Sequence, residues 1–336
     1  MVLLSNMHDW LLYLVIILAV IFDFINGFHD TANAIATVVS TRVLSPVAAI
    51  LMGASLNFLG ALSGTAVAKT IGSGIVGTNV LTEVVVAALV GAIIWNLLTW
   101  YFGIPSSSSH ALIGGLIGGG VAASGIHQVH GQVLIQKVLL PFFASPIVGF
   151  LGGIFLMIII MKLFARMKLS TTNSFFRRFQ VVSSAFMAFS HGSNDAQKTM
   201  GIVTLALISA GKIHATPFVV PVWVIALSAI AMALGTAGGG WRIIKTMGSG
   251  IVKLTPVHGF AAETAAATVI EVASRFGFPL STTHVIGSSI LGVGAGKRIR
   301  SVRWSLVSTI VRAWIFTIPV AALFSWTSYK LLFFLK

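Results

Sequence analysis

Residues 27–34 read Gly-Phe-His-Asp-Thr-Ala-Asn-Ala, and residues 192–199 read Gly-Ser-Asn-Asp-Ala-Gln-Lys-Thr. The second segment begins 165 positions after the first. Each starts with glycine, carries an aspartate three residues later and lies inside an otherwise apolar stretch. A single match of this kind would mean little in a glycine-rich chain, so the rest of the sequence has to show whether it is one part of a longer repeat.

Two further pairs of segments occur in the same order. Residues 69–76 match residues 245–252 in a Lys-Thr-x-Gly-Ser-Gly-Ile-Val pattern, 176 positions apart. Residues 103–110 match residues 277–284, 174 positions apart, and both contain Gly-x-Pro, a run of hydroxyl residues and His. Three matches in register with nearly constant spacing predict that the chain arose by duplication.

The composition predicts a membrane protein. Of the 336 residues 57% are hydrophobic and 8% are charged, with a mean hydropathy of +0.99, whereas soluble domains average about 25% charged residues. A helix needs roughly 20 apolar residues to cross the bilayer, so the chain accommodates roughly ten crossings. We therefore expect an all-α polytopic membrane protein of about 10–12 transmembrane or half-membrane helices, some of them broken.

The basic residues predict how the halves are oriented. The segment 162–180 is rich in Lys and Arg and is expected to be a cytoplasmic linker. The loop at 124–130 has no Lys or Arg, but its counterpart at 297–300 has three. Equivalent loops on opposite sides predict two inverted repeats, residues 1–161 and residues 181–336. Both termini are then outside, in a multi-pass protein of the cell (inner) membrane.

The same counts exclude several classes of function. The net charge of +14 is better explained by loops that meet anionic lipid headgroups than by nucleic acid. The absence of cysteine excludes disulfides, thiol catalysis and Cys-ligated metals. A membrane phosphatase or transferase has little support, because the sequence has no metal-ligand cluster and no soluble domain. We expect no enzyme activity and no cofactor.

Asp30 and Asp195 occupy the same position in the two halves. A charge at the middle of the bilayer costs about 2.5–3.5 kcal/mol, so such residues face a cavity, a partner or an ion. A helix broken at Gly27 and at Gly192 would offer its free carbonyl groups and the carboxylates to a small cation. Oxygen ligands suit sodium, and the His29 imidazole suits protons. The alternative is a pair of ionic contacts that hold helices together.

The hydroxyl runs 106–109 and 281–283 each follow a proline and precede an apolar stretch. This pattern predicts the N-terminus of a helix, where free N–H groups and the positive dipole end favour anions. Two such ends would form a donor-rich cage for a tetrahedral oxyanion. The alternative is that these residues cap and pack helices. Lys198 has two interpretations as well, since it neutralises the oxyanion or pairs with Asp195.

These motifs resemble the inorganic phosphate transporter family, whose duplicated signature reads Gly-Ala-Asn-Asp-Val-Ala-Asn-Ala. The resemblance covers nearly the whole chain, including both Pro–Ser/Thr–His motifs. It implies a homodimer, two inverted repeats, broken helices, and phosphate held between the repeats. It also implies a secondary symporter that imports phosphate by alternating access.

The resemblance assigns two groups of site residues. The coupling-ion residues are His29, Asp30, Asn33, Asn194 and Asp195, of which Asp30 and Asp195 are the metal ligands if the ion is sodium. The phosphate ligands are Ser107, Ser108, Ser109, Ser281, Thr282 and Thr283, with which we place Gln197 and Lys198.

Three departures from the signature bear on the coupling ion. His29 stands where Asn is usual, and Gln197 and Lys198 stand where Ala and Asn are usual. The His form is similar to the bacterial low-affinity permeases, in which phosphate, partly as a neutral metal–phosphate complex, enters with protons. Proton coupling is therefore favoured and sodium coupling stays open. A sulfate permease of the same fold and a passive anion channel are the alternative functions.

Overall fold

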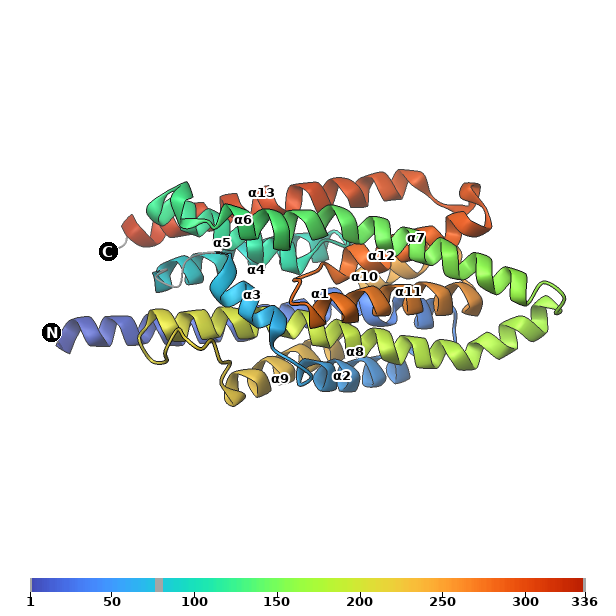
Figure 1. Cartoon of the computed structure of the whole chain (residues 1–336), viewed down its shortest axis with the longest axis horizontal. Coiled ribbons are helices and arrows are strands. Elements are labelled where there is room, and N and C mark those ends of the chain that lie inside the picture. The colour runs from blue at the N-terminus through green and yellow to red at the C-terminus, as the bar shows by residue number, and fades with distance from the viewer. Residues whose placement is uncertain (1, 76–80, 335–336) are drawn as a thin grey trace.

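The computed structural model describes residues 2–75 and 81–334, which form helices and connections with no strand among them (Figure 1). The first half begins with a 39-residue helix and continues through a series of shorter ones. Its elements are α1 (Val2–Ser40), α2 (Pro46–Ala61), α3 (Ala66–Gly74), α4 (Thr82–Tyr101), α5 (Ser108–Ser124), η1 (Ile126–Gln128), α6 (Gly131–Val133), η2 (Leu134–Leu139) and α7 (Leu140–Leu163).

The second half repeats this order. It begins with a 41-residue helix, continues with a bent pair, and has a short helix between two longer ones near its end. Its elements are α8 (Leu169–Ser209), α9 (Val222–Gly238), α10 (Trp241–Lys245), η3 (Thr246–Gly250), α11 (Pro256–Arg275), α12 (Thr282–Lys297), η4 (Ile299–Ser301) and α13 (Trp304–Phe334).

Each half contains one helix pair that is bent at a short break. The axes of α2 and α3 differ by 71°, and those of α9 and the α10–η3 segment differ by 63°. At the second break Gly239 has φ +68, a left-handed conformation that glycine adopts without strain. The predicted all-α fold with broken helices is therefore confirmed for the described residues.

The breaks are not where the sequence placed them. Both α1 and α8 continue without interruption through Gly27 and Gly192. A Cβ atom at Gly27 would collide with the backbone of Met232 on α9, and one at Gly192 with the backbone of Asn57 on α2. The prediction of a break at these glycines is wrong, because they admit a crossing helix whose packing hides the nearby polar groups from lipid.

The halves pack against each other through equivalent contacts. The long helix of each half crosses the bent pair of the other, since α1 packs on α9 and α8 packs on α2. In the same way α5 packs on α13 and α12 packs on α7. Gly118 lies against the carbonyl of Ala322, and Gly292 lies against that of Phe150. Neither half is a separate globule; each completes the packing of the other.

The apolar helices have the length and surface of a multi-pass membrane protein. Four helices of the described chain are long and apolar enough to cross a bilayer, and six are if each bent pair counts as one span. On α7 the exposed side chains include Ile147, Leu151 and Phe155, at 58%, 56% and 64% exposure. Such a continuous apolar exterior suits lipid rather than water.

The two termini lie at one end of the elongated bundle, and the α7–α8 connection lies at the opposite end (Figure 1). That connection spans 164–168, so residues 169–180 of the predicted linker are helical and belong to α8. Aromatic packing accounts for this, because Phe176 is buried 5.2 Å from the ring of Phe260. Arg177 also donates to the carbonyl of Arg42 at 2.9 Å.

Candidate functional site

The two matched aspartates meet where α1 and α8 pack together. Asp30 is 2% exposed and Asp195 is fully buried. One ligand atom each from Asp30, Asp195 and His191 lies within 4.8 Å of the other two. The duplicated motifs therefore build one centre rather than two separate sites.

Asp195 is surrounded by donors from two helices. The ammonium group of Lys198, one turn later on α8, forms an ion pair with Oδ1. The Nε2 atom of His191 lies 3.3 Å from Oδ2, and the Thr282 hydroxyl donates to the same oxygen at 3.2 Å. Lys198 thus pairs with Asp195, as one of the two interpretations of its role expected.

Asp30 has a histidine as its partner. The Nδ1 atom of His29 lies 2.5 Å from Asp30 Oδ1, and Nε2 lies 3.1 Å from the hydroxyl of Thr99 on α4. The Thr99 hydroxyl also lies 3.0 Å from the carbonyl of Trp95, so His29 links Asp30 on α1 to the backbone of α4 through Thr99.

The hydroxyl runs begin two helices, as predicted. Ser107 is the N-cap of α5 and accepts from the N–H of His110 at 3.2 Å. Ser281 is the N-cap of α12 and accepts from the N–H of His284 at 3.2 Å. The rings of His110 and His284 lie 4.8 Å apart. The positive ends of two helix dipoles therefore meet inside the protein.

Hydrogen bonds join these helix starts to the aspartates. Asn33 on α1 donates to the hydroxyls of Thr282 and Thr283 at 3.2 and 2.9 Å. Lys198 donates to the hydroxyl of Ser109 and, at 3.1 Å, to the carbonyl of Leu280. We use the term central cluster for the buried residues that these contacts connect, which are His29, Asp30, Asn33, Ser109, His191, Asp195, Lys198, Thr282 and Thr283.

Several polar atoms at or beside the central cluster have no protein partner. They include Oδ1 of Asn33 and Oγ of Ser108, both buried. The imidazole of His284 has no hydrogen bond at either nitrogen, and His110 has none at Nδ1. Because more than nine in ten buried polar groups in proteins are hydrogen-bonded, this concentration of free donors and acceptors suits a polar ligand between the two helix starts.

Two predicted site residues point away from the central cluster. The side chain of Gln197 accepts from the N–H of Val67 at 2.8 Å, at the start of α3. Asn194 donates to the hydroxyl of Ser274 at 2.7 Å and to the carbonyl of Phe278. Both amides face the α11 side, where a separate cavity of about 190 Å³ is lined by Gln197 and Ser274.

Some of the polar residues around the centre were not assigned from the sequence. His191 belongs to the polar stretch of sequence around Asp195, which by itself gives this residue no role, and it lies one turn before Asp195. Glu263 on α11 accepts hydrogen bonds from Thr37, Gln180 and Ser183. Its neighbours come from α1 and α8, so no local sequence signal indicates this network.

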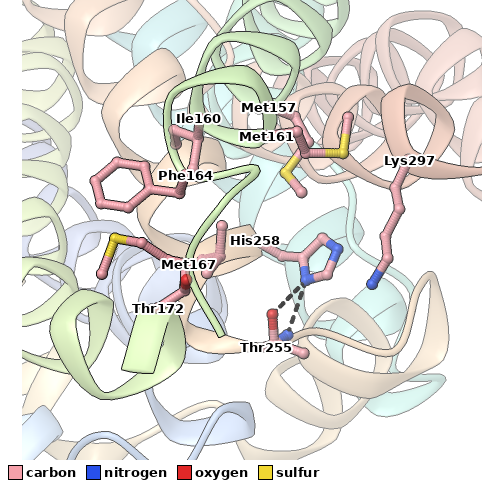
Figure 2. A pocket seen from close by; sticks show the side chains of 10 residues that line it. Met157, Ile160, Met161, Phe164, Met167, Thr172, Thr255, His258 and Lys297 are labelled. Carbon is pink, nitrogen blue, oxygen red and sulfur yellow. Dashed lines mark hydrogen bonds between the residues drawn. The ribbon is translucent and has the colours of Figure 1, made fainter. Parts of the chain in front are cut away.

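A second cavity lies away from the central cluster, between α7, α8, α11 and α12 (Figure 2). It has a volume of about 270 Å³, and its walls are mainly apolar, including Met157, Met161 and Phe164. Figure 2 shows His258, hydrogen-bonded to Thr255, on the same side as the amine of Lys297. None of the predicted site residues lines this cavity.

Known proteins resemble this chain over nearly its whole length. The model of the phosphate transporter family matches residues 26–325. A probable low-affinity inorganic phosphate transporter of Bacillus subtilis is 47% identical over 322 residues, which cover 95% of this chain and 96% of that protein. One of Rhizobium meliloti is 49% identical over 312 residues, covering 92% and 93%. A solved structure of a protein described as "The sodium-dependent phosphate transporter" has a TM-score of 0.86 at 26% identity, covering 97% of this chain and all of that one.

Proposed function

Because the chain belongs to the phosphate transporter family, we propose that it is a symporter that imports inorganic phosphate together with protons by alternating access. The single observation that carries this proposal is the meeting of two helix N-termini with Asp30, Asp195 and Lys198 in one buried cluster. The helix ends and Lys198 supply positive potential for an oxyanion, and the carboxylates supply negative potential for a cation.

The balance of buried charges supports coupling to a cation. Among the described residues the buried charged side chains are four carboxylates and one ammonium group: Asp23, Asp30, Asp195, Glu263 and Lys198. A phosphate monoanion or dianion would bring negative charge into an interior where, among the described residues, Lys198 is the one buried Lys or Arg side chain. Burying such an anion is costly unless a cation accompanies it. Phosphate is therefore expected to enter with at least one cation.

The identity of that cation follows from a difference between the halves. Position 198 holds lysine where the equivalent position of the first half holds Asn33. The ammonium group of Lys198 lies against Asp195 Oδ1, where a sodium ion would need that oxygen as a ligand. A fixed cation thus replaces one mobile ion, and protons are the coupling ions that remain compatible with this site. A sodium ion at Asp30 and Asp195 is the alternative, since the related solved structure is described as that of a sodium-dependent phosphate transporter.

A metal–phosphate complex is a second form of the cargo. Asp30, His191 and Asp195 present one nitrogen and two carboxylate oxygens within 4.8 Å of each other, a donor set that suits a divalent cation. The metal would travel with phosphate and would not stay in the protein. Uptake that rises with added Mg²⁺ and carries the metal in a fixed ratio to phosphate would support this form.

The architecture supports alternating access. The equivalent contacts of α1 with α9 and of α8 with α2 support our interpretation of residues 1–161 and residues 181–336 as inverted repeats. We propose that the two repeats rock around the central cluster, that the α7–α8 end is cytoplasmic and that both termini are outside the cell membrane. Basic residues at the α7–α8 end, such as Arg166 and Lys168, fit this orientation. The proposed assembly is a homodimer.

Radiolabelled phosphate uptake into proteoliposomes tests the proposal. Vesicles containing the purified protein are given a proton gradient in one set and a sodium gradient in another. We expect uphill phosphate accumulation driven by protons and only weakly competed by sulfate. Accumulation driven by sodium alone would show that the coupling ion is sodium, and accumulation of sulfate instead of phosphate would show that the cargo is sulfate. Equilibration without accumulation would indicate a passive channel.

A further inference from the structure

A third acidic residue, Asp23, lies deep in the protein on the same helix as Asp30. It is fully buried and precedes Asp30 by seven residues, about two helical turns. The equivalent position in the second half is Ala188, so this carboxyl group is not part of the duplicated pattern. It is a feature that one half has and the other lacks.

The contacts of Asp23 are with hydroxyl groups. Thr199 on α8 donates to Oδ1 at 2.6 Å, and the hydroxyl of Ser228 on α9 lies beside the carboxyl group. The other oxygen, Oδ2, is buried and has no hydrogen-bond partner. Within the described part of the chain Asp23 has no basic side chain in contact, in contrast to Asp195, which pairs with Lys198, and Asp30, which contacts the imidazole of His29.

The charged neighbours of Asp23 are limited. On α8 they are Asp195 and Lys198, which act on Asp23 through the electric field rather than by contact. The sequence of α9 contains no ionisable residue, and Glu83 in the first turn of α4 is the charged residue of that helix. On α1 itself the nearest ionisable groups are His29 and Asp30.

This environment suits a carboxyl group that gains and loses a proton. A buried carboxylate without a cation in contact is costly, and protonation removes that cost. Hydroxyl groups can donate to the carboxylate and can also accept from the acid, so Thr199, which donates to Oδ1, can serve both forms. Glu263 also lacks a cation in contact, but three donors hold it, at both oxygens, whereas one oxygen of Asp23 has no hydrogen-bond partner.

We propose that Asp23 is the proton-binding site of the transport cycle, an inference that rests on the proposed proton–phosphate symport. Thr199, whose hydroxyl donates to Asp23, directly follows Lys198 in α8, and the Lys198 ammonium group contacts Ser109 in the central cluster, so Asp23 acts on that ammonium group through the electric field. When Asp23 binds a proton, a negative charge close to Lys198 disappears. The positive potential of Lys198 is then available to phosphate, so proton binding and phosphate binding favour each other.

The replacement Asp23→Asn tests this proposal because it mimics the protonated form permanently. We expect proteoliposomes with this variant to exchange internal for external phosphate at a rate within about threefold of the unaltered protein and without dependence on pH. Proton-driven accumulation should fall at least about tenfold, which corresponds to a loss of about 1.4 kcal/mol in the coupling free energy between proton and phosphate binding. Asp23→Glu should retain pH-dependent accumulation.

Control variants separate the possible failures. Glu271 forms an ion pair with Arg275, at a distance of 2.8 Å, and this pair is not part of the central cluster. The variant Glu271→Gln should therefore accumulate phosphate normally. Glu263→Gln tests the competing acid. If the unaltered protein shows no proton-driven accumulation, the proposed function fails. Two results would overturn the assignment of Asp23 while leaving the proposed function intact. The first is that Asp23→Asn accumulates phosphate as well as the unaltered protein does. The second is that Glu263→Gln, and not Asp23→Asn, exchanges phosphate without accumulating it.

Discussion

The starts of the two halves place an aspartate at the same point of the same kind of helix, yet they surround it with different groups. Asp30 has a histidine directly before it and Asn33 one turn after it. Asp195 has its histidine one turn before it and Lys198 one turn after it. The backbone positions are shared, and the charges of the neighbours are not.

The glycines on the two helices show the opposite behaviour. Gly27 and Gly192 each meet the backbone of a crossing helix from the other half, at Met232 and Asn57. The packing of the halves has therefore remained equivalent while their electrostatics have diverged. We infer that the shared fold provides the framework for rocking. We also infer that Lys198 in the second half serves anion binding, whereas Asp23 in the first half serves proton binding.

The largest expected difference between the halves is that between Asp195→Asn and Asp30→Asn. The first change leaves the Lys198 ammonium group without its carboxylate, and breaking a buried ion pair costs roughly 3–5 kcal/mol. We expect phosphate uptake by Asp195→Asn to fall to background, at least about 100-fold. Asp30→Asn should retain measurable uptake, because the amide can still bond to His29.

Both variants are to be compared at equal amounts of protein in the membrane, measured by immunoblotting of the membrane fraction. Equal losses in the two variants would contradict the assigned asymmetry. Normal accumulation by Asp195→Asn would remove this residue from the mechanism altogether.

A second comparison converts the second half into the first by Lys198→Asn. This change deletes the fixed cation and leaves Asp195 with His191 and Thr282 as neighbours. We expect proton-driven uptake to fall by roughly 10- to 100-fold, since one charge-assisted hydrogen bond contributes about 1.5–3 kcal/mol. The residual uptake should now be stimulated by sodium, which can reach the freed carboxylate oxygen. Uptake assayed with sodium or with choline in the external buffer measures this.

A residual uptake that choline supports as well as sodium would mean that Lys198 does not take the place of a mobile ion. Lys198→Arg is the matched control, since it keeps the charge, and it should show no sodium stimulation.

Much of this comparison could be predicted from the sequence, because the repeat itself carried the information. Matching the halves placed Asp30 beside Asp195 and indicated that the hydroxyl runs begin helices. The glycines were misinterpreted because a break and a close crossing both call for the missing Cβ atom. The orientation of Gln197 toward Val67 depends on a neighbour 130 residues away, and no local pattern specifies such a contact.

The packing comparison can be tested with Gly27→Ala and Gly192→Ala. A Cβ atom at either position would meet backbone atoms that cannot move aside. We expect each change to lower the free energy of unfolding by about 1–3 kcal/mol, the usual cost of overpacking. Gly152→Ala on α7 is the control, since its Cβ atom would lie 3.5 Å from that of Ala265. Thermal unfolding in detergent should show equal losses for the first two variants, and a loss confined to one would contradict the equivalence of the crossings.

The smallest expected effect concerns the two capping serines and distinguishes capping from ligand binding. Ser107 and Ser281 each accept from a backbone N–H and keep their own hydroxyl proton to donate. Replacement of an N-cap serine by alanine costs about 1 kcal/mol of stability, but replacement by glycine costs only a few tenths. Ser107→Gly and Ser281→Gly should therefore unfold at nearly the original temperature. If the hydroxyls also bind phosphate, each variant should raise the KM for phosphate about fivefold, which corresponds to about 1 kcal/mol for one lost hydrogen bond. An unchanged KM in both would leave these serines as caps alone, and an increase in only one would show that phosphate lies closer to that half.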